Sequence, residues 1–256
     1  LIQKADKNGR ILQPGHLERF NPAVLAIETR LTRPMFFEAH RLSVFTPRAL
    51  DVDVVLDLMI HDLDIVLTFA HSPVREVRAV GLPILSPKVD IANVRVEFES
   101  GCVANFTASR VSTEQVRKLR FFEPRQYVSI DYARRDLLII RVEAAAGQIP
   151  AELAAAIAAG KVDAATLARL AAGAGNGATP GFQFLKPEIT PGEPLQLEIL
   201  SFLDSIRTRK APHVTARQGR AALELALEIQ STMVAHAQRA GLGDFFNAES
   251  TANNAL

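Results

Sequence analysis

Cysteine and aromatic residues are scarce in this chain. It contains one cysteine, no tryptophan and two tyrosines among 256 residues. With Cys102 alone, no disulfide can form within the chain, and a zinc site built from several cysteines is excluded. A chain that uses cysteine so sparingly fits a reducing compartment, and no signal-peptide pattern opens it. We therefore expect a cytoplasmic protein.

The chain also lacks an excess of charge of one sign and long apolar runs. Its 29 basic and 28 acidic residues give a formal net charge of +1 and are spread along the sequence. Because there is no polybasic block, we expect no nucleic-acid partner. No apolar run approaches the roughly 20 residues of a membrane-spanning helix, so we expect no membrane partner. Binding partners must therefore be inferred from individual sites in the sequence and not from the overall charge.

The hydrophobic pattern predicts a sheet of short strands. Residues 91–99 alternate apolar and polar side chains, and the alternation resumes after Ser100 and Gly101, which predicts a hairpin with one buried face. Such closely spaced strands must pair antiparallel, because a parallel crossover needs a dozen or more residues. Further strands are expected over residues 10–13, 34–45, 117–123, 126–133, 136–142 and 182–190.

Helical periodicity marks further segments. Asn21 before Pro22 predicts a helix that runs to about Leu31, and Asp51 or Asp53 can cap another that ends near His71. Two helices, over residues 193–209 and 216–238, close the chain. Their expected buried faces consist of Leu195, Ile199, Phe202 and Ile206 in the first, and Leu223, Ala226, Leu227 and Val234 in the second.

Together these elements predict an α/β (α+β) fold. We expect an open, predominantly antiparallel mixed sheet with helices packed on one face. An alanine-rich segment, residues 143–178, is expected to be a helical insertion on this sheet.

The strongest candidate site lies in the sequence DLMIHDLDIV, residues 57–66. The segment is aliphatic almost all round, yet Asp57, His61 and Asp64 are spaced by four and three residues, which places them on one helix face. His61 could act as a general base near neutral pH, with a carboxylate one turn away that fixes its tautomer. The alternative is a buried structural network. Asp62, about 100° around the helix, is expected to form a salt bridge. No further ligands are marked by spacing, so no metal is expected.

Arginines form two weaker candidate sites. Arg19 and Asn21 precede a helix start, where they could receive an anion or a carboxamide; the alternative is a surface charge and a plain helix cap. Arg110, Arg117 and Arg120 bracket the middle strands. They could meet a diphosphate, or simply form a solvated strand face.

The stretches LIQKADKNGRILQPGHLERFNPAV and DVVLDLMIHDLDIVL resemble the Gfo/Idh/MocA oxidoreductases. The resemblance covers nearly all of the chain outside the insertion. In that family an N-terminal Rossmann domain binds NAD(P), and a C-terminal domain supplies the substrate site and oligomer contacts. The family's Asp-x-x-x-His pattern matches Asp57 and His61, which implies that His61 accepts the proton of the oxidised hydroxyl.

The same resemblance implies roles for the stretch GHxxRFNP. His16, Arg19 and Asn21 would lie near the nicotinamide or the substrate, and Asp64 would support the same site. GHLERFNPAV, HDLDIVL and SRVSTEQVRKLRFF are most similar to the UDP-N-acetylglucosamine 3-dehydrogenase-like subgroup. The resemblance thus implies oxidation of a ring hydroxyl of a sugar or sugar nucleotide, in a homo-oligomer joined through the open sheet face.

Two family features are lacking. No G-x-G-x-x-G follows a strand, and no Glu-Lys-Pro segment precedes the matched region. NAD or NADP is therefore expected to be bound mainly by an N-terminal domain that this chain lacks. Residues 1–14 would be the last helix and strand of that Rossmann domain, residues 15–242 the substrate domain, and residues 243–256 a disordered tail. Two alternatives stay open: a non-catalytic homo-oligomerisation domain, and a reductase of another cyclic substrate on the same fold.

Overall fold

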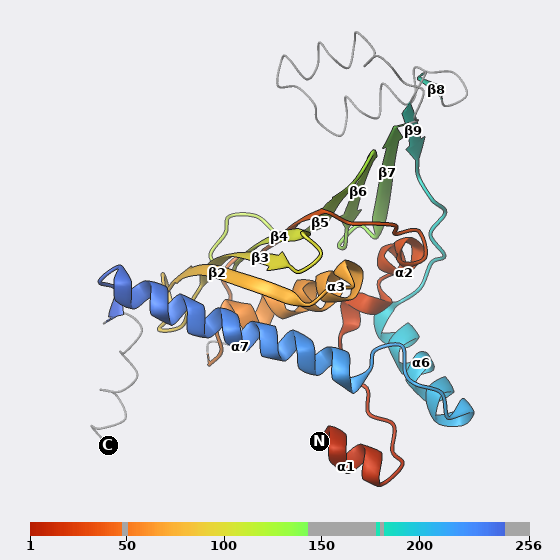
Figure 1. Cartoon of the computed structure of the whole chain (residues 1–256), viewed down its shortest axis with the longest axis horizontal. Helices are drawn as coiled ribbons and strands as arrows, with labels where there is room; N and C mark the ends of the chain where they lie inside the picture. Colours follow the sequence, from red (N-terminus) through yellow and green to blue (C-terminus); the bar gives the residue numbers. More distant parts are fainter. Residues whose placement is uncertain (48–50, 143–177, 180–181, 244–256) are drawn as a thin grey trace.

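The centre of the molecule is one open sheet. In the computed structural model, residues 1–47, 51–142, 178–179 and 182–243 are described, and their strands form a nine-stranded sheet of order β2-β3-β4-β1-β5-β6-β7-β9-β8 (Figure 1). The strands are β1 Phe36–Leu42, β2 Val74–Leu82, β3 Ile91–Phe98, β4 Val103–Ser109, β5 Val116–Glu123, β6 Gln126–Asp131, β7 Asp136–Val142, β8 Ala178–Thr179 and β9 Phe182–Leu185.

The sheet is mixed, with one parallel pair. All neighbouring strands pair antiparallel except β1 and β4, which run parallel from Phe36 beside Val103 to Leu42 beside Ser109. The chain between β1 and β4 is long enough to include a helix, as a parallel pair requires. The predicted fold class, an open and predominantly antiparallel mixed sheet, is confirmed.

Two strand predictions differ from the structure. The edge strand β2 was not expected, because Arg75, Glu76 and Arg78 break the apolar alternation; a bulge between Val74 and Glu76 shifts its register. The strand expected over residues 10–13 does not form. A β-strand requires backbone hydrogen bonds to a neighbouring strand, and no described segment forms them with these residues.

The described helices are α1 Ile2–Lys7, the 3-10 helix η1 Leu17–Phe20, α2 Pro22–Glu28, the π-helix η2 Val55–Met59, α3 Ile60–Ala70, α6 Pro194–Thr208 and α7 Ala216–Arg239. Of these, α2, η2, α3 and α7 pack on the sheet, on one face as predicted, and α7 runs along β2 beside α3 (Figure 1). α1 and α6 lie farther from the strands.

The predicted helix starts are confirmed. The Asn21 side chain accepts a hydrogen bond from the Ala23 amide at 3.1 Å, and Asp53 Oδ1 accepts one from the Val55 amide at 2.9 Å. α2 ends at Glu28 and not near Leu31. The chain turns away there, since Glu123 at the end of β5 accepts hydrogen bonds from both the amide and the hydroxyl of Thr32.

The predicted buried faces of the two closing helices are largely wrong. In α7 only Ala226 of the expected set is buried, while Leu227 is 50% exposed. Apolar residues occur on several sides of this helix, so periodicity alone does not fix which side meets β2 and α3. α6 packs against η1, and three residues of its expected face are exposed, Leu195, Ile199 and Ile206, while Phe202 is half-buried. The residues that α7 buries are Ala222, Leu225, Ala226, Ile229, Met233 and Ala237.

Two predicted segments lie outside the described residues. They are the helical insertion over residues 143–178 and the tail over residues 243–256, except for their end residues 178 and 243. Among the helices that the structure describes, none combines the length and apolar character needed to cross a membrane.

Candidate functional site

The helix that carries the candidate residues begins with a widened turn. Val55–Met59 forms the π-helix η2, which continues directly into α3. A π turn adds one residue relative to an α-helix, and so rotates the preceding residues by about 100°. Asp57 lies within this turn, whereas His61 and Asp64 follow it. The angle between Asp57 and Asp64 around the helix axis therefore differs from the value that a regular helix predicts.

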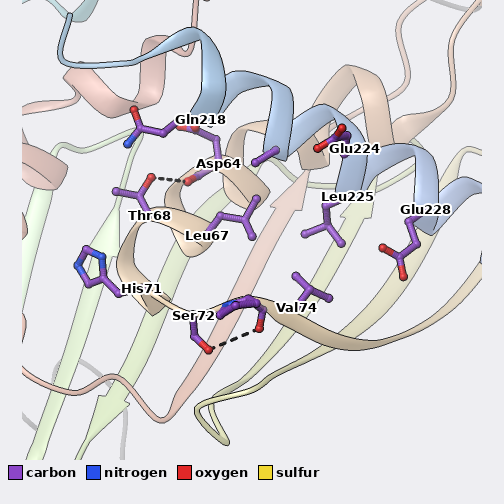
Figure 2. Close-up of a pocket in the computed structure, with 12 residues that line it drawn as sticks. Asp64, Leu67, Thr68, His71, Ser72, Val74, Gln218, Glu224, Leu225 and Glu228 are labelled. Atoms are coloured by element: carbon purple, nitrogen blue, oxygen red, sulfur yellow. Dashed lines mark hydrogen bonds between the residues drawn. The ribbon is translucent and has the colours of Figure 1, made fainter. Parts of the chain in front are cut away.

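Asp57 and Asp64 line two different cavities. Asp64 lies in a cavity of about 470 Å³ between α3 and α7, together with Thr68, His71 and Gln218 (Figure 2). Asp57 lines a second cavity, of about 480 Å³, where β1 ends and β5 begins. No residue is shared by the two linings.

Asp64 is a buried carboxylate with cationic neighbours. Only 2% of the residue is exposed, and its Oδ2 lies 3.9 Å from His16 Nδ1 and 3.8 Å from Arg19 Nη1. Within the described part of the chain, neither carboxylate oxygen accepts a hydrogen bond. Burial raises the pKa of Asp64, and the nearby His16 and Arg19 oppose this rise. The predicted residues His16, Arg19 and Asp64 are thus brought together.

Arg19 is not the surface charge that one alternative predicted. It is 2% exposed, and its Nη1 donates a hydrogen bond of 2.6 Å to Thr68 Oγ1 in α3. Its Nη2 donates to Glu28 Oε1 at 3.4 Å, at the end of α2. Arg19 therefore ties η1 to two helices, so that the adjacent His16 has a fixed position.

The side chain of Asn21 forms hydrogen bonds with other groups of the protein. Besides its capping oxygen, its Nδ2 donates hydrogen bonds to the Tyr132 carbonyl at 3.1 Å and to Glu18 Oε2 at 3.3 Å. This arrangement fits the interpretation of Asn21 as a cap that also joins α2 to the sheet. A ligand contact by Asn21 stays a prediction.

The imidazole ring of His61 lies near that of His16. The two imidazole rings are 6.5 Å apart and nearly perpendicular, at 80°. His61 Nδ1 is buried, with no hydrogen-bond partner among the described residues. Burial lowers the pKa of His61 from its ordinary 6.5, and the charge of Arg41 lowers it further, while Asp62 and Glu18 oppose the shift. The neutral imidazole that results at neutral pH is able to accept a proton.

A buried ion-pair network holds α3 on the sheet beside His61. Arg41 of β1 donates two hydrogen bonds to Asp62 and a third, of 3.0 Å, to Glu18 Oε1, which confirms the predicted salt bridge of Asp62. Arg41 Cζ lies 5.3 Å from the ring centroid of Tyr132, and burial raises the pKa of that phenol. Sequence reasoning missed Arg41. The available signal was its position, two residues after Ala39 on the buried side of β1.

The second cavity combines a carboxylate with cationic and neutral polar groups. It is lined by Ser43, Val44, Thr46, Asp57, Leu58, Arg110, Gln115 and Arg117. Within the described chain, the carboxylate of Asp57 has no hydrogen bond or ion pair, to His61 or to any other residue. The structure thus brings Asp57 together with Arg110 and Arg117. Arg120 lies elsewhere, with its Nη1 3.4 Å from Glu38 Oε2.

The described residues fit only part of a dinucleotide-dependent site. They contain no strand, glycine-rich turn and helix of the kind that holds a dinucleotide diphosphate. They do supply a candidate proton acceptor, His61. Among these residues, no group of three or more histidine, cysteine, aspartate or glutamate side chains is arranged to hold a metal ion.

Comparison with known proteins decides the family. The sequence model of the GFO/IDH/MocA C-terminal domain matches residues 23–124. UDP-N-acetylglucosamine 3-dehydrogenase of Acidithiobacillus ferrooxidans is 31% identical over 240 residues, which cover 93% of this chain and 67% of that protein. This chain belongs to the GFO/IDH/MocA oxidoreductase family. The matched region contains Asp57, His61 and Asp64.

Solved structures of other dehydrogenases share the fold. A structure of the Acidithiobacillus ferrooxidans enzyme superposes with a TM-score of 0.75 at 30% identity, over 91% of this chain and 66% of that one. Levoglucosan dehydrogenase in complex with NADH gives a TM-score of 0.67 at 12% identity, over 89% and 65% of the two chains. Our chain thus spans about two thirds of the length of these relatives.

Proposed function

We propose that this chain is the substrate-binding and catalytic half of an NAD(P)-dependent dehydrogenase that oxidises a ring hydroxyl of a sugar or sugar nucleotide. The name of the relative from Acidithiobacillus ferrooxidans supports a substrate of this class. The proposal rests on His61, which lies on the helix that follows the π turn containing Asp57. Burial lowers the pKa of this histidine. A neutral imidazole is the group that such an oxidation needs.

In the proposed reaction, His61 accepts the proton of the substrate hydroxyl. Arg41 disfavours a second positive charge nearby and so keeps the resting imidazole neutral. Asp62 and Glu18 stabilise the imidazolium after proton transfer, because their charges act in the opposite direction. Oxidation of the carbon also requires a hydride acceptor, for which we propose NAD or NADP bound mainly by an N-terminal part of the intact protein.

The other predicted site residues have different proposed roles. We assign Asp57 to the substrate, because its carboxylate lines an open cavity and makes no described contact with the protein. Asp64 and Arg19 position His16 beside His61 through the contacts of 3.8–3.9 Å at Asp64 Oδ2. Asn21 supports this arrangement through its cap at the start of α2.

We further propose a cytoplasmic homo-oligomer formed through the open face of the sheet. The face opposite the helices includes Phe36, Phe122 and Tyr127, whose rings are spaced by 5.6 and 5.2 Å across three strands. Phe122 is 36% exposed. An aromatic cluster at the surface of a sheet is a suitable centre for a contact between subunits.

The proposed reaction is tested in the full-length protein with a His61→Ala variant. Turnover of UDP-N-acetylglucosamine with NAD or NADP should fall about 10²- to 10⁴-fold, the usual contribution of a general base, while substrate affinity changes only a few-fold. His40→Ala is the matched control, because His40 lies on β1 with its side chain on the opposite face of the sheet. Near-normal turnover by His61→Ala would show that His61 is not the base.

The two alternatives predict different outcomes in the same assay. A non-catalytic oligomerisation domain would yield an intact oligomer that oxidises no cyclic sugar with either cofactor. A reductase of another cyclic substrate would oxidise the reduced cofactor when the corresponding ketone is supplied. Gel filtration together with assays in both directions separates these cases.

A further inference from the structure

Arg117 is directed toward the helix-covered side of the sheet. It lies opposite Arg41 in the antiparallel pair of β5 with β1, and directly opposed residues point to the same face. Arg41 defines this face, because it reaches Asp62 on α3. Arg117 therefore projects into the space beside η2, where it lines the same cavity as Asp57.

Two of the three arginines Arg41, Arg110 and Arg117 already form ion pairs and hydrogen bonds with other residues of the protein. Arg41 is neutralised by Asp62 and Glu18. Arg110 donates from Nε to Asp90 at 2.7 Å, from Nη1 to the Val52 carbonyl at 2.9 Å and from Nη2 to Ser86 Oγ at 3.0 Å. Each of its three nitrogens is thus already used.

Arg117 differs from both. Across the described ranges, no carboxylate pairs with its guanidinium and no side chain or carbonyl accepts a hydrogen bond from it. The residue is partly exposed within a cavity that several polar residues line. A planar guanidinium with free donors matches the geometry of a phosphate or carboxylate, so the cavity presents a prepared contact for an anion.

The remaining lining determines how a ligand would be oriented. Ser43, Thr46 and Gln115 offer hydroxyl and amide groups, and the volume of about 480 Å³ falls within the range of small-ligand sites. Asp57 would repel an anion but accepts a hydrogen bond from a hydroxyl. The anionic part of a ligand is therefore expected to lie toward Arg117, with its hydroxyl-bearing part toward Asp57.

We propose that Arg117 binds the diphosphate of a nucleotide-linked sugar and thereby leaves the sugar on the side of the cavity that Asp57 lines. This inference rests on the proposed function and deepens it, because it assigns the substrate class to one side chain. The dinucleotide cofactor also contains a diphosphate. Recognition of the substrate and recognition of the cofactor therefore have to be tested separately.

The test compares Arg117→Gln with Arg120→Gln in the full-length protein. Arg120 is a matched control on the same strand, because it projects from the opposite face and pairs with Glu38. Loss of a charge-assisted contact should raise the KM for UDP-N-acetylglucosamine about 10- to 100-fold in Arg117→Gln. The KM for NAD, the KM for free N-acetylglucosamine and kcat should stay within about 3-fold of the wild type, the scatter expected for contacts that are not made.

Three results would overturn the proposal. The first is an unchanged KM for the sugar nucleotide, and the second is an equal rise for the free sugar. The third is a rise in the KM for NAD in place of that for the substrate, which would assign Arg117 to the cofactor. Circular dichroism and the Arg120→Gln control show whether a change reflects loss of folding.

A binding measurement distinguishes failure of this inference from failure of the proposed function. UDP is titrated by calorimetry into the wild-type protein, Arg117→Gln and Arg120→Gln. Weaker UDP binding in Arg117→Gln alone supports the diphosphate contact even if no sugar is oxidised, in which case only the proposed function fails. Equal UDP affinity in all three proteins refutes the contact, and oxidation that depends on His61 would still support the proposed function.

Discussion

Arg41 and Asp62 are joined by two hydrogen bonds, from Nε to Oδ2 at 2.7 Å and from Nη2 to Oδ1 at 3.0 Å. Their side chains are only 5% and 2% exposed. The planar guanidinium fixes the direction of both bonds, so the pair determines how α3 sits on β1. His61, next to Asp62 in the chain, takes its position from this arrangement.

Removal of Asp62 should strongly destabilise the protein. In Asp62→Ala the buried charge of Arg41 loses its main partner, which typically costs about 3–5 kcal/mol. Urea denaturation of the variant and the wild type measures this difference. The double variant Arg41→Met with Asp62→Leu should recover part of the loss, because the buried Arg41 charge is removed; Glu18, whose side chain is 16% exposed, then keeps only its hydrogen bond from Asn21. A cost below about 1 kcal/mol for Asp62→Ala, typical of an exposed pair, would contradict this account.

His61 should titrate below its ordinary pKa of 6.5 in the folded protein. Burial and Arg41 both favour the neutral ring, so NMR should show the midpoint of its imidazole proton shift at a lower pH. The unfolded chain then takes up a proton before the native state does. The free energy of unfolding should therefore decrease as the pH falls from 6.5 toward the native pKa.

His61→Gln identifies the resonance and removes this part of the pH dependence. Because glutamine does not titrate, the stability of the variant should change less than that of the wild type over the same pH interval. A His61 midpoint at or above 6.5 would show that Asp62 and Glu18 outweigh burial and Arg41.

Asp64→Asn should stabilise the protein at neutral pH. Burial raises the pKa of this carboxyl above its ordinary 3.8, so the native state loses stability as the pH rises through the native pKa. Asparagine does not ionise, and we expect a gain of about 1 kcal/mol at pH 7, or about 2–4 °C in Tm. The gain should vanish as the pH approaches 4, a trend that thermal melts between pH 4 and 8 would reveal.

The exposed Asp204→Asn serves as the control and should show no such pH-dependent gain. If Asp64→Asn were less stable than the wild type at pH 7, the contacts with His16 and Arg19 would outweigh the cost of burial.

Gly81 allows β2 to pack closely against α7. An added Cβ would meet Met233 Sδ and lie 2.7 Å from Val89 Cγ1. Gly81→Ala should therefore destabilise the protein by about 1–3 kcal/mol, as overpacking commonly does. Urea denaturation checks this, with Gly243→Ala as a control because a Cβ there has nothing within 4 Å.

Met233 is one of the two neighbours that an added Cβ would meet, so its removal should relieve part of this clash, while the contact with Val89 remains. A double-mutant cycle of Gly81→Ala with Met233→Ala should yield a favourable coupling energy. Additive effects would show that the added methyl group is accommodated elsewhere.

Several features of the fold could be predicted because their signals are local. The hairpin of β3 and β4 follows from strict alternation around Gly101, which adopts a φ of 83°. The starts of α2 and η2 follow from the capping chemistry of Asn21 and Asp53. β2 escaped prediction because its charged residues lie at the sheet edge, where alternation is not required.

For the candidate site, local sequence signals identified which residues could take part in chemistry but not which of them lie close together. The spacing of Asp57, His61 and Asp64 suggested one polar stripe, whereas the π turn directs Asp57 and Asp64 into different cavities. Helical periodicity and capping residues do not predict a π turn. Arg41 was missed because a charged residue in a strand usually faces solvent, and its partner Asp62 lies in a different element.

The sequence by itself determined the strand and helix segments, the caps and the chemically capable residues, because periodicity and capping depend on neighbours within a few positions. Only the tertiary structure decided which face of α7 is buried, which arginine lacks a protein partner and which carboxylate lies beside which cation. These relationships join segments far apart in the chain, such as Arg41 with Asp62 and Arg117 with Asp57. They depend on burial and on distances across the sheet, which no local pattern encodes.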